Sequence, residues 1–264
     1  MILVTGATGT TGSLLVDELL GRGVEVTAIT RDPARITPRA GLTVSTSVVA
    51  ADALYLLSPA GPGVPEHDLA TLRAAAGAGI RRVVKLSAIG TPDEVAPGGW
   101  HQAGEKAVRE SRLEWTILRP TTFASNSLGW AADIRAGRPI PNLFGDGAQG
   151  IVDPADVAAV AAEALTSGGH HQRTYTLTGP ELLTVHDQVG RLSEVLGRPL
   201  TVVDVEASVE HFPPEIAEVA LAGVALVRRG GNAIVTGDVQ EVLGRKAGSY
   251  EAWAENNRNA FMPE

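Results

Sequence analysis

The sequence predicts an α/β protein in which a doubly wound parallel sheet carries helices on both faces. Two observations lead to this expectation. Short apolar runs alternate with longer Ala- and Leu-rich runs, and the connections between them are brief, which is typical of strands joined by crossover helices. The strand candidates are apolar without clean alternation, and strands of this kind are buried on both faces of a sheet.

The elements follow one another in regular order over the first half of the chain. Strands are expected at Ile2–Thr5, Val24–Thr30, Leu54–Leu57, Arg82–Ser87 and Trp115–Leu118. Helices are expected between them at Thr11–Gly21, Glu66–Ala78 and Trp100–Ser111. Each strand–helix–strand unit makes its two strands parallel, because the crossover returns the chain to the same edge of the sheet. On the last helix, Glu105 and Lys106 are expected on the solvated face.

The segment between the second and fourth strands is too short for this pattern. Only the 22 residues 31–52 lie between them, and each regular crossover needs roughly 10–12 residues. If Leu42–Thr46 is the third strand, Ser47–Asp52 barely reaches the next strand even when it is fully extended. The fold is therefore shortened between strands 2 and 4: we predict that the helix before the fourth strand is missing and that the third strand is short or displaced.

A change of rhythm after Pro120 indicates a small C-terminal lobe. Gly and Pro cluster there, and two capped helices and a strand are then expected, at Pro154–Ser167, Thr184–Gly197 and Leu200–Val203. We expect a core at residues 1–125 and a smaller substrate-binding lobe at residues 126–264. The two are expected to pack as a single compact unit without a flexible linker.

The composition excludes several classes of protein. The chain has no cysteine, which excludes disulfides, thiolate zinc sites, iron–sulfur clusters and a cysteine nucleophile. A net charge of −8 with scattered basic residues argues against a nucleic-acid partner. The amino terminus shows no secretory signal, and the apolar run Val219–Val227 is too short to span a membrane. We therefore expect a cytoplasmic protein. We expect no metal site, since His170 and His171 are adjacent in a solvated turn and cannot easily face one ion. The oligomeric state stays open.

The strongest functional signal is the run Val4-Thr5-Gly6-Ala7-Thr8-Gly9-Thr10-Thr11-Gly12, which joins the first strand to the first helix. Its glycines allow a tight turn and a close backbone approach to a pyrophosphate, whose charge then lies at the helix amino terminus. This pattern favours a dinucleotide-binding loop of the Rossmann type; a structural turn without a ligand is the alternative. The expected cofactor-binding residues are Gly6, Gly9 and Gly12, which shape the loop, and Thr8, Thr10 and Thr11, which donate hydrogen bonds.

The end of the second strand indicates which dinucleotide is bound. The turn reads Thr30-Arg31-Asp32-Pro33. An acidic residue here binds ribose hydroxyls, whereas an arginine suits a 2′-phosphate through charge-assisted hydrogen bonds. Since Arg31 comes first, we expect it to bind the 2′-phosphate and NADP(H) to be preferred over NAD(H). An exposed Arg–Asp pair on a turn is the alternative.

These motifs carry a family resemblance. The chain resembles the NmrA-like group of atypical short-chain dehydrogenases/reductases in LVTGATGTTG, TRDP, ALYLLSP, VVKLSAIG, WTILRPTTF and IVDPADVAAVAAEAL, which together span nearly its whole length. The group includes NAD(P)H-dependent quinone reductases, aromatic reductases and ketoreductases, and also co-regulators that bind the dinucleotide without turning it over. Its members normally carry a Gly-Asp-Leu type segment near the adenine, and the absence of that segment from Arg39–Ser47 predicts an open adenine end.

The chain departs from the family at the position of the proton donor. Short-chain dehydrogenases usually place a Tyr and a Lys four residues apart, and the tyrosine protonates the carbonyl oxygen. By analogy with relatives, Pro97 occupies the tyrosine place and His101 the lysine place. Ser87 stays where the family serine polarises a carbonyl, so Ser87 and His101 are the catalytic candidates. Three roles for His101 stay open: contact with cofactor or substrate, a partly exposed helix residue, and a general acid.

Open parallel sheets bind ligands beyond the carboxyl ends of their strands. This rule adds five residues to the cofactor-binding candidates, namely Ser58, Pro59, Ser87, Pro120 and Thr121. A substrate-binding aromatic wall for a flat acceptor is expected from Trp100, Phe123 and Trp130, with Asn126 as a polar candidate. Packing of the small lobe is the alternative explanation of these rings.

We therefore expect an NAD(P)H-dependent oxidoreductase that lacks the Tyr/Lys pair and transfers a hydride to a small or polycyclic ketone or quinone. Such acceptors need no protein acid, since water can supply the proton. The alternative is a non-catalytic, dinucleotide-sensing regulatory protein of the NmrA type that binds a protein partner. A reductase should enclose an aromatic-lined pocket, whereas a sensor should expose an apolar patch.

Overall fold

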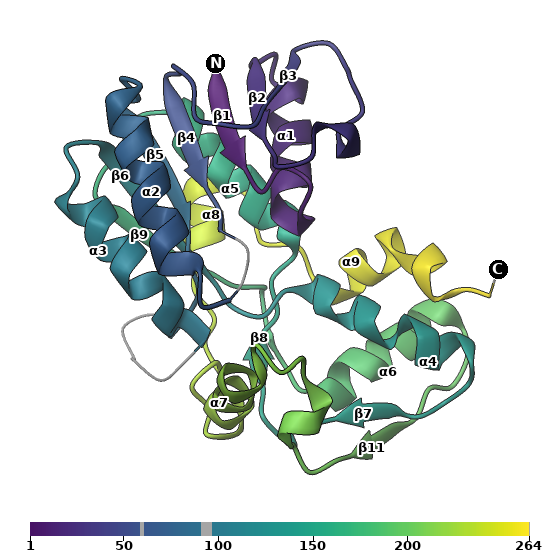
Figure 1. The fold of residues 1–264 in the computed structure, drawn as a ribbon. Helices are drawn as coiled ribbons and strands as arrows, with labels where there is room; N and C mark the ends of the chain where they lie inside the picture. Colours follow the sequence, from purple (N-terminus) through teal and green to yellow (C-terminus); the bar gives the residue numbers. More distant parts are fainter. Residues whose placement is uncertain (59–60, 91–96, 264) are drawn as a thin grey trace. The chain divides into compact units, whose positions relative to one another are not determined.

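The computed structural model describes residues 1–58, 61–90 and 97–263, and the chain folds into two compact units (Figure 1). The first unit holds the chain up to Gly90, Gly98–Pro120 and Pro154–Thr176. The second holds Thr121–Asp153 and the residues from Leu177 onward. This division differs from the expected boundary at residue 126, because residues 154–176 return to the first unit and pack there.

The first unit is built on the parallel sheet that the sequence predicts. Seven strands in the order β3-β2-β1-β4-β5-β6-β9 form it: β1 (Ile2–Thr5), β2 (Val26–Ile29), β3 (Leu42–Ser45), β4 (Ala53–Leu56), β5 (Arg82–Leu86), β6 (Glu114–Pro120) and β9 (Arg173–Leu177). All pairings among β1 to β6 are parallel. The chain order reverses between β1 and β4, so the carboxyl ends of these strands form the switch point where such sheets bind ligands. The predicted fold class is confirmed.

Helices cover both faces of this sheet (Figure 1). They are α1 (Thr10–Gly21), α2 (Val64–Gly77), the 3₁₀ turn η2 (Pro97–His101), α3 (Gln102–Glu110) and α5 (Pro154–Thr166). Helix α1 packs against α5, which explains why α5 belongs to the first unit, and α2 packs against α3. The core beneath α2 and α3 takes alternate strand residues, among them Leu54, Leu56 and Val83. Lys85 and Ser87 continue this alternation from Val83, so they point toward the same two helices.

The connection from β3 to β4 holds no helix. Residues 46–52 run as bends and extended chain, and the connection from β2 to β3 holds only the short 3₁₀ turn η1 (Pro33–Arg35). The missing helix before the fourth strand is therefore confirmed. Strand β3 has four residues, and it pairs in register with β2 from Leu42 to Ser45, so it is short without being displaced.

The second unit combines short strands and helices. They are η3 (Ala124–Trp130), α4 (Ala131–Arg135), β7 (Ile140–Asn142), β8 (Gln149–Gly150), β10 (Leu182–Leu183), α6 (Val185–Leu196), β11 (Val202–Asp204), η4 (Val209–His211), α7 (Ala217–Arg228), α8 (Asp238–Leu243), α9 (Tyr250–Asn256) and η5 (Arg258–Phe261). Strand β11 pairs with β7 in parallel and β10 pairs with β8 antiparallel. The capped helix that the sequence predicts at Thr184–Gly197 is present as α6: Thr184 caps it with a capping box, and Gly197 ends it in the left-handed region.

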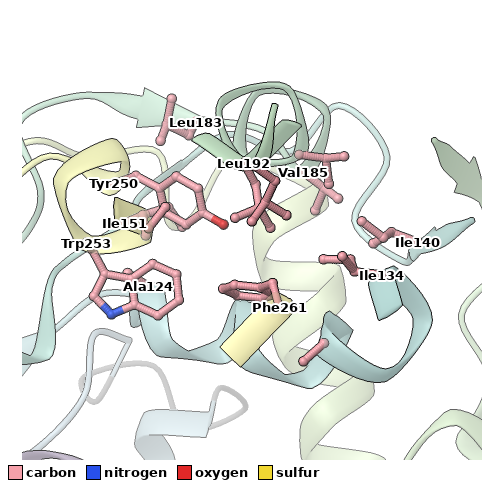
Figure 2. Packing of buried hydrophobic residues seen from close by; sticks show 14 residues of the cluster. Ala124, Ile134, Ile140, Ile151, Leu183, Val185, Leu192, Tyr250, Trp253 and Phe261 are labelled. Atoms are coloured by element: carbon pink, nitrogen blue, oxygen red, sulfur yellow. The ribbon is translucent and has the colours of Figure 1, made fainter. Parts of the chain in front are cut away.

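Aromatic side chains near the carboxyl terminus close the core of the second unit. Figure 2 shows Tyr250 pointing toward Leu192 of α6, with the rings of Trp253 and Phe261 in the same cluster. The rings of Trp253 and Phe261 meet edge to face with centroids 6.3 Å apart, and Tyr250 donates a hydrogen bond to Ser127 at 2.8 Å. The last segment of the chain is thus part of this core.

Candidate active site

The loop between β1 and α1 has the backbone geometry of a phosphate-binding turn. Gly6 has φ +64°, in the left-handed region, and its carbonyl accepts a hydrogen bond from the Gly9 N–H at 2.9 Å. A Cβ atom on Gly12 would lie 2.1 Å from the Gly6 oxygen, so no side chain fits there. The glycines therefore bring the first turn of α1 directly onto the loop.

The amino terminus of α1 is open for an anion. Its N-cap residue is Gly9, which provides no side-chain cap, and no acidic residue lies in the first turn. Thr8 and Thr10 are exposed beside it. Thr11 differs, because its side chain is 2% exposed and its Oγ1 accepts a hydrogen bond from Tyr55 at 3.3 Å. Among the three threonines, only Thr8 and Thr10 present exposed hydroxyls.

A hollow of about 500 Å³ adjoins this loop on the side of β2. Its lining includes Thr8 from the loop, Ala28 from β2, and Arg35 and Arg39 from the shortened connection. Arg39 pairs with Asp17 at 2.6 Å, whereas Arg35 has no ion-pair partner within the described ranges of the chain. The uncapped helix, the glycine cradle and these guanidinium groups fit a dinucleotide with its phosphates at α1.

The predicted cofactor residue Arg31 does not line this hollow. It is exposed on the turn after β2. Its neighbour Asp32 accepts a hydrogen bond from the Ala34 N–H at 3.1 Å and so caps η1. The acidic residue of this turn therefore has a local structural role, and the basic residues at the hollow come four and eight positions after Arg31.

A buried carboxylate holds the serine candidate. Ser87, at the end of β5, donates a hydrogen bond to Glu105 Oε1 at 2.6 Å. Arg119 of β6 binds both carboxylate oxygens of Glu105 at 2.9 and 2.6 Å, and Arg109 reaches Oε2 at 3.1 Å. Since a hydroxyl has a single hydrogen, Ser87 in this position cannot also donate to a substrate.

The expectation that Glu105 lies on a solvated helix face was wrong, whereas Lys106 is exposed as expected. Glu105 is 4% exposed, because α3 turns it toward β5 and β6 where Arg119 lies. Burial opposes ionisation of Glu105, but the hydrogen bonds from Arg119 and Ser87 outweigh it and lower the pKa of this carboxyl. Glu105 is therefore an ionised structural anchor of the site.

A second buried ion pair lies on β5, two positions before Ser87. Lys85, at 0% exposure, binds Asp68 Oδ2 of α2 at 2.5 Å, and Asp68 is equally buried. Asp68 Oδ1 accepts a hydrogen bond from Ser58 at 2.6 Å, and Ser58 Oγ lies 2.7 Å from Nδ1 of the exposed His67. The predicted cofactor residue Ser58 is thus bound within the protein, while Pro59 lies outside the described residues.

His101 lies at the junction of η2 and α3, half-buried, with Nδ1 3.4 Å from Lys85 Nζ. Burial and, secondly, the charge of Lys85 lower the pKa of His101 to about 4. The imidazole is therefore neutral at physiological pH. Of the roles left open by the sequence, this disfavours a general acid that exchanges protons near neutrality.

The other predicted residues fall in both units. Pro120 ends β6 and half-buried Trp100 lies in η2, both in the first unit. Thr121, Phe123, Asn126 and Trp130 belong to the second unit. Thr121 is buried and donates a hydrogen bond to the Leu177 carbonyl at 3.1 Å, and Trp130 packs on the core of the second unit. Asn126 is exposed.

Sequence reasoning missed Asp68, Lys85, Arg119 and Arg35. A signal existed for the ion pair, because Lys85 interrupts the apolar run of a strand buried on both faces, and a buried cation requires a buried partner. Within the described ranges, no group of three or more His, Asp or Glu residues is placed to hold a metal ion. No helix in the same part of the chain is long and apolar enough to cross a membrane.

The family model described as NAD(P)H-binding matches residues 6–168, more than half of the chain. The chain belongs to this NAD(P)H-binding family. A (4-alkanoyl-5-oxo-2,5-dihydrofuran-3-yl)methyl phosphate reductase from Streptomyces griseus is 39% identical over 285 residues, which cover 100% of both chains. An NAD(P)H azoreductase from Xenophilus azovorans is 30% identical and covers 99% of both.

A solved structure shows the same fold. The NADPH-dependent quinone oxidoreductase from Escherichia coli, complexed with NADPH, superposes with a TM-score of 0.85 at 21% identity, over 98% of this chain and 100% of that one. The family model and the two curated relatives confirm the expected class, an NAD(P)H-dependent oxidoreductase of the atypical short-chain type that binds a nicotinamide dinucleotide.

Proposed function

We propose that the chain reduces an electron-poor conjugated carbonyl compound, a small or polycyclic quinone or activated ketone, with NADPH as the preferred cofactor. The bound dinucleotide supplies the hydride, and the protein binds and orients the reactants. The observation that carries this proposal is that neither Ser87 nor His101 is in a hydrogen-bonding or protonation state that lets it give a proton to a substrate. The hydroxyl hydrogen of Ser87 is donated to Glu105, and His101 is neutral near pH 7, so it has no imidazolium proton to transfer as a general acid.

A simple ketone receives no proton from either of these two groups. Its alkoxide product needs a proton during hydride transfer, and a positioned general acid contributes about 10²–10⁴-fold to such a step. A quinone or an acylated unsaturated lactone instead spreads the new negative charge over several atoms, so water can protonate it afterwards. The names of the relatives support this choice, since an acyl oxo-dihydrofuran, an azo compound and a quinone all hold an electron-poor conjugated system.

Turnover with matched acceptors tests the proposed function. We expect the protein to oxidise NADPH, followed by its absorbance, with a quinone and with an acylated 2(5H)-furanone. An unactivated aliphatic ketone should react at least about 100-fold more slowly, because general acid catalysis is missing. Binding of NADPH without oxidation by any acceptor would instead favour the dinucleotide sensor. Efficient reduction of the aliphatic ketone would contradict the argument from Ser87 and His101.

The preference for NADPH is proposed to rest on Arg35, with Arg31 as the second candidate. Arg35 lines the hollow beside the phosphate loop and lacks an ion-pair partner within the described residues, whereas Arg39 is paired with Asp17. We expect Arg35→Ala to weaken NADPH about 10–100-fold, since a hydrogen bond to a charged group contributes roughly 1.5–3 kcal/mol. NADH, which lacks the 2′-phosphate, should change little.

Fluorescence titration of both dinucleotides against both variants measures this effect. The Arg31→Ala variant is the comparison, because the Arg31 side chain is exposed on the same connection after β2 but does not line the hollow. A larger loss of NADPH affinity in Arg31→Ala would return the 2′-phosphate to the residue that the sequence indicates. Equal losses for NADPH and NADH in both variants would refute a 2′-phosphate role for either arginine.

A further inference from the structure

The buried ion pair Asp68–Lys85 contacts His101, one of the two catalytic candidates, through the Lys85 ammonium group. Lys85 Nζ lies 2.5 Å from Asp68 Oδ2 and 3.4 Å from His101 Nδ1, and the Leu86 carbonyl is also 3.4 Å away. The ammonium thus has two oxygen acceptors and one imidazole nitrogen around it. Asp68 and Lys85 are both fully buried, so this arrangement is shielded from water.

The chemistry of the two groups determines the direction of the contact. An ammonium group has three hydrogens and no lone pair, so it can only donate. His101 Nδ1 must then be the acceptor, which leaves the single hydrogen of the neutral ring on Nε2. Within the described ranges of the chain, no side chain or carbonyl hydrogen-bonds Nε2. The half-buried ring therefore presents an N–H that the protein does not use.

We propose that the Asp68–Lys85 ion pair positions His101 as a neutral Nε2–H donor, and that this N–H stabilises the acceptor oxygen as negative charge develops on it. The second half of this proposal rests on the proposed function. His101 keeps its hydrogen throughout: a C–H bond of the reduced dinucleotide would break as the hydride forms a C–H bond on the acceptor, the π electron pair of the acceptor moves to its oxygen, and water later supplies the proton. Lys85 and Asp68 are positioning residues, since they act through His101.

The packing of α3 is built around this contact. Gly104 lies one helical turn after His101, and a Cβ atom at position 104 would meet Asp68 Oδ2 at 1.9 Å and Lys85 Cε at 2.9 Å. No side chain fits there, so α3 lies directly on the ion pair. This close approach brings His101 within reach of Lys85 and explains a glycine in the first turn of α3.

The charged groups around His101 agree with this assignment. Lys85 of β5 lowers its tendency to take a second proton, whereas Asp68 of α2 and Glu105 of its own helix raise it. Burial is the largest influence, and the pKa of about 4 keeps the ring neutral above roughly pH 5. A neutral imidazole can donate a hydrogen bond over the whole physiological range without releasing its proton.

Nitrogen NMR of the free protein tests the tautomer without any turnover. In ¹⁵N-histidine-labelled wild-type protein, we expect His101 to carry its hydrogen on Nε2 only and to show no titration between pH 6 and 8. The Asp68→Leu/Lys85→Met double variant removes both charges together and leaves neither one buried alone. In that variant, a population with the hydrogen on Nδ1 should appear. The control is Lys106→Met, which changes an exposed lysine of α3, the helix that follows His101; its His101 should carry the hydrogen on Nε2 as in wild type.

Two results would overturn the positioning role: a wild-type His101 with its hydrogen on Nδ1, or a double variant that folds and keeps the wild-type tautomer. The wild-type spectrum decides the first point even if the double variant fails to fold. Neither result depends on an acceptor, so this half of the proposal can fail while the proposed reductase stands.

Steady-state kinetics test the donor role. His101→Leu is expected to lower kcat about 10²–10³-fold, as loss of one donor to a developing oxyanion does, with little change in KM for NADPH. His101→Gln keeps an N–H donor and should recover part of that loss. A His101→Leu variant within twofold of wild type would overturn the donor role. Absence of turnover in wild type would overturn the proposed function and the donor role, and leave the tautomer result intact.

Discussion

The Gly12→Ala variant is expected to lose most of its affinity for the dinucleotide. The new methyl group would lie 2.1 Å from the Gly6 oxygen and 3.1 Å from Ala7 Cα, so the loop or the first turn of α1 must move away. Overpacking of this kind costs typically 1–3 kcal/mol. Because the same loop forms the phosphate site, a comparable loss in binding corresponds to about 10–100-fold in Kd. Fluorescence titration with NADPH measures it.

Gly21 provides the matched control, because it lies at the other end of α1. A Cβ atom there has nothing within 4 Å, and the residue does not need the left-handed region. Gly21→Ala should therefore bind NADPH as wild type does, and it should be as stable or slightly more stable, since alanine favours a helix. Wild-type affinity in Gly12→Ala would show that the loop is not the phosphate site.

Glu105→Leu is expected to have the largest effect on stability. It leaves Arg119 and Arg109 without their carboxylate and Ser87 without its acceptor. Removing one partner of a buried ion pair costs about 3–5 kcal/mol, and we expect about 3 kcal/mol because both arginines are partly exposed. Urea unfolding measures this change. Glu110→Leu, on the exposed side of the same helix, should change stability by less than about 0.5 kcal/mol.

The stabilisation by Glu105 also depends on pH. Since its pKa is lower in the folded protein than the ordinary 4.5, the carboxylate stabilises the fold fully above pH 4.5. This contribution is lost progressively as the pH falls below that value, through the folded-state pKa. The difference in unfolding free energy between wild type and Glu105→Leu should therefore shrink on acidification from pH 6 to pH 3. A constant difference would contradict the lowered pKa.

The sequence predicts the fold well because most of its evidence is local. Apolar runs of four or five residues identified β1, β4 and β5, and simple chain length identified the missing helix between β3 and β4. The division of the chain was harder, because the return of α5 to α1 depends on contacts between residues more than a hundred positions apart. A pattern within a few neighbouring residues cannot predict such a contact.

The candidate site was predicted in outline only. Glycine spacing identified the phosphate loop, since backbone geometry is encoded in residue type. The environment of Glu105 was missed, because a glutamate beside a lysine on a helix usually faces water and only the fold brings Arg119 to it. In the same way, Arg35 became a candidate when the short connection after β2 turned it toward the phosphate loop.

The short connections around β3 also make that strand an indicator of ligand binding. None of the four residues of β3 is buried, and neither neighbouring connection contains an α-helix that could pack on the strand. Its amides should therefore exchange with deuterium through local opening, well before those of β1 and β4, whose residues are all buried. The hollow that carries Arg35 and Arg39 also includes Leu42 of this strand, so occupation by a dinucleotide should slow the exchange of β3 more than that of any central strand.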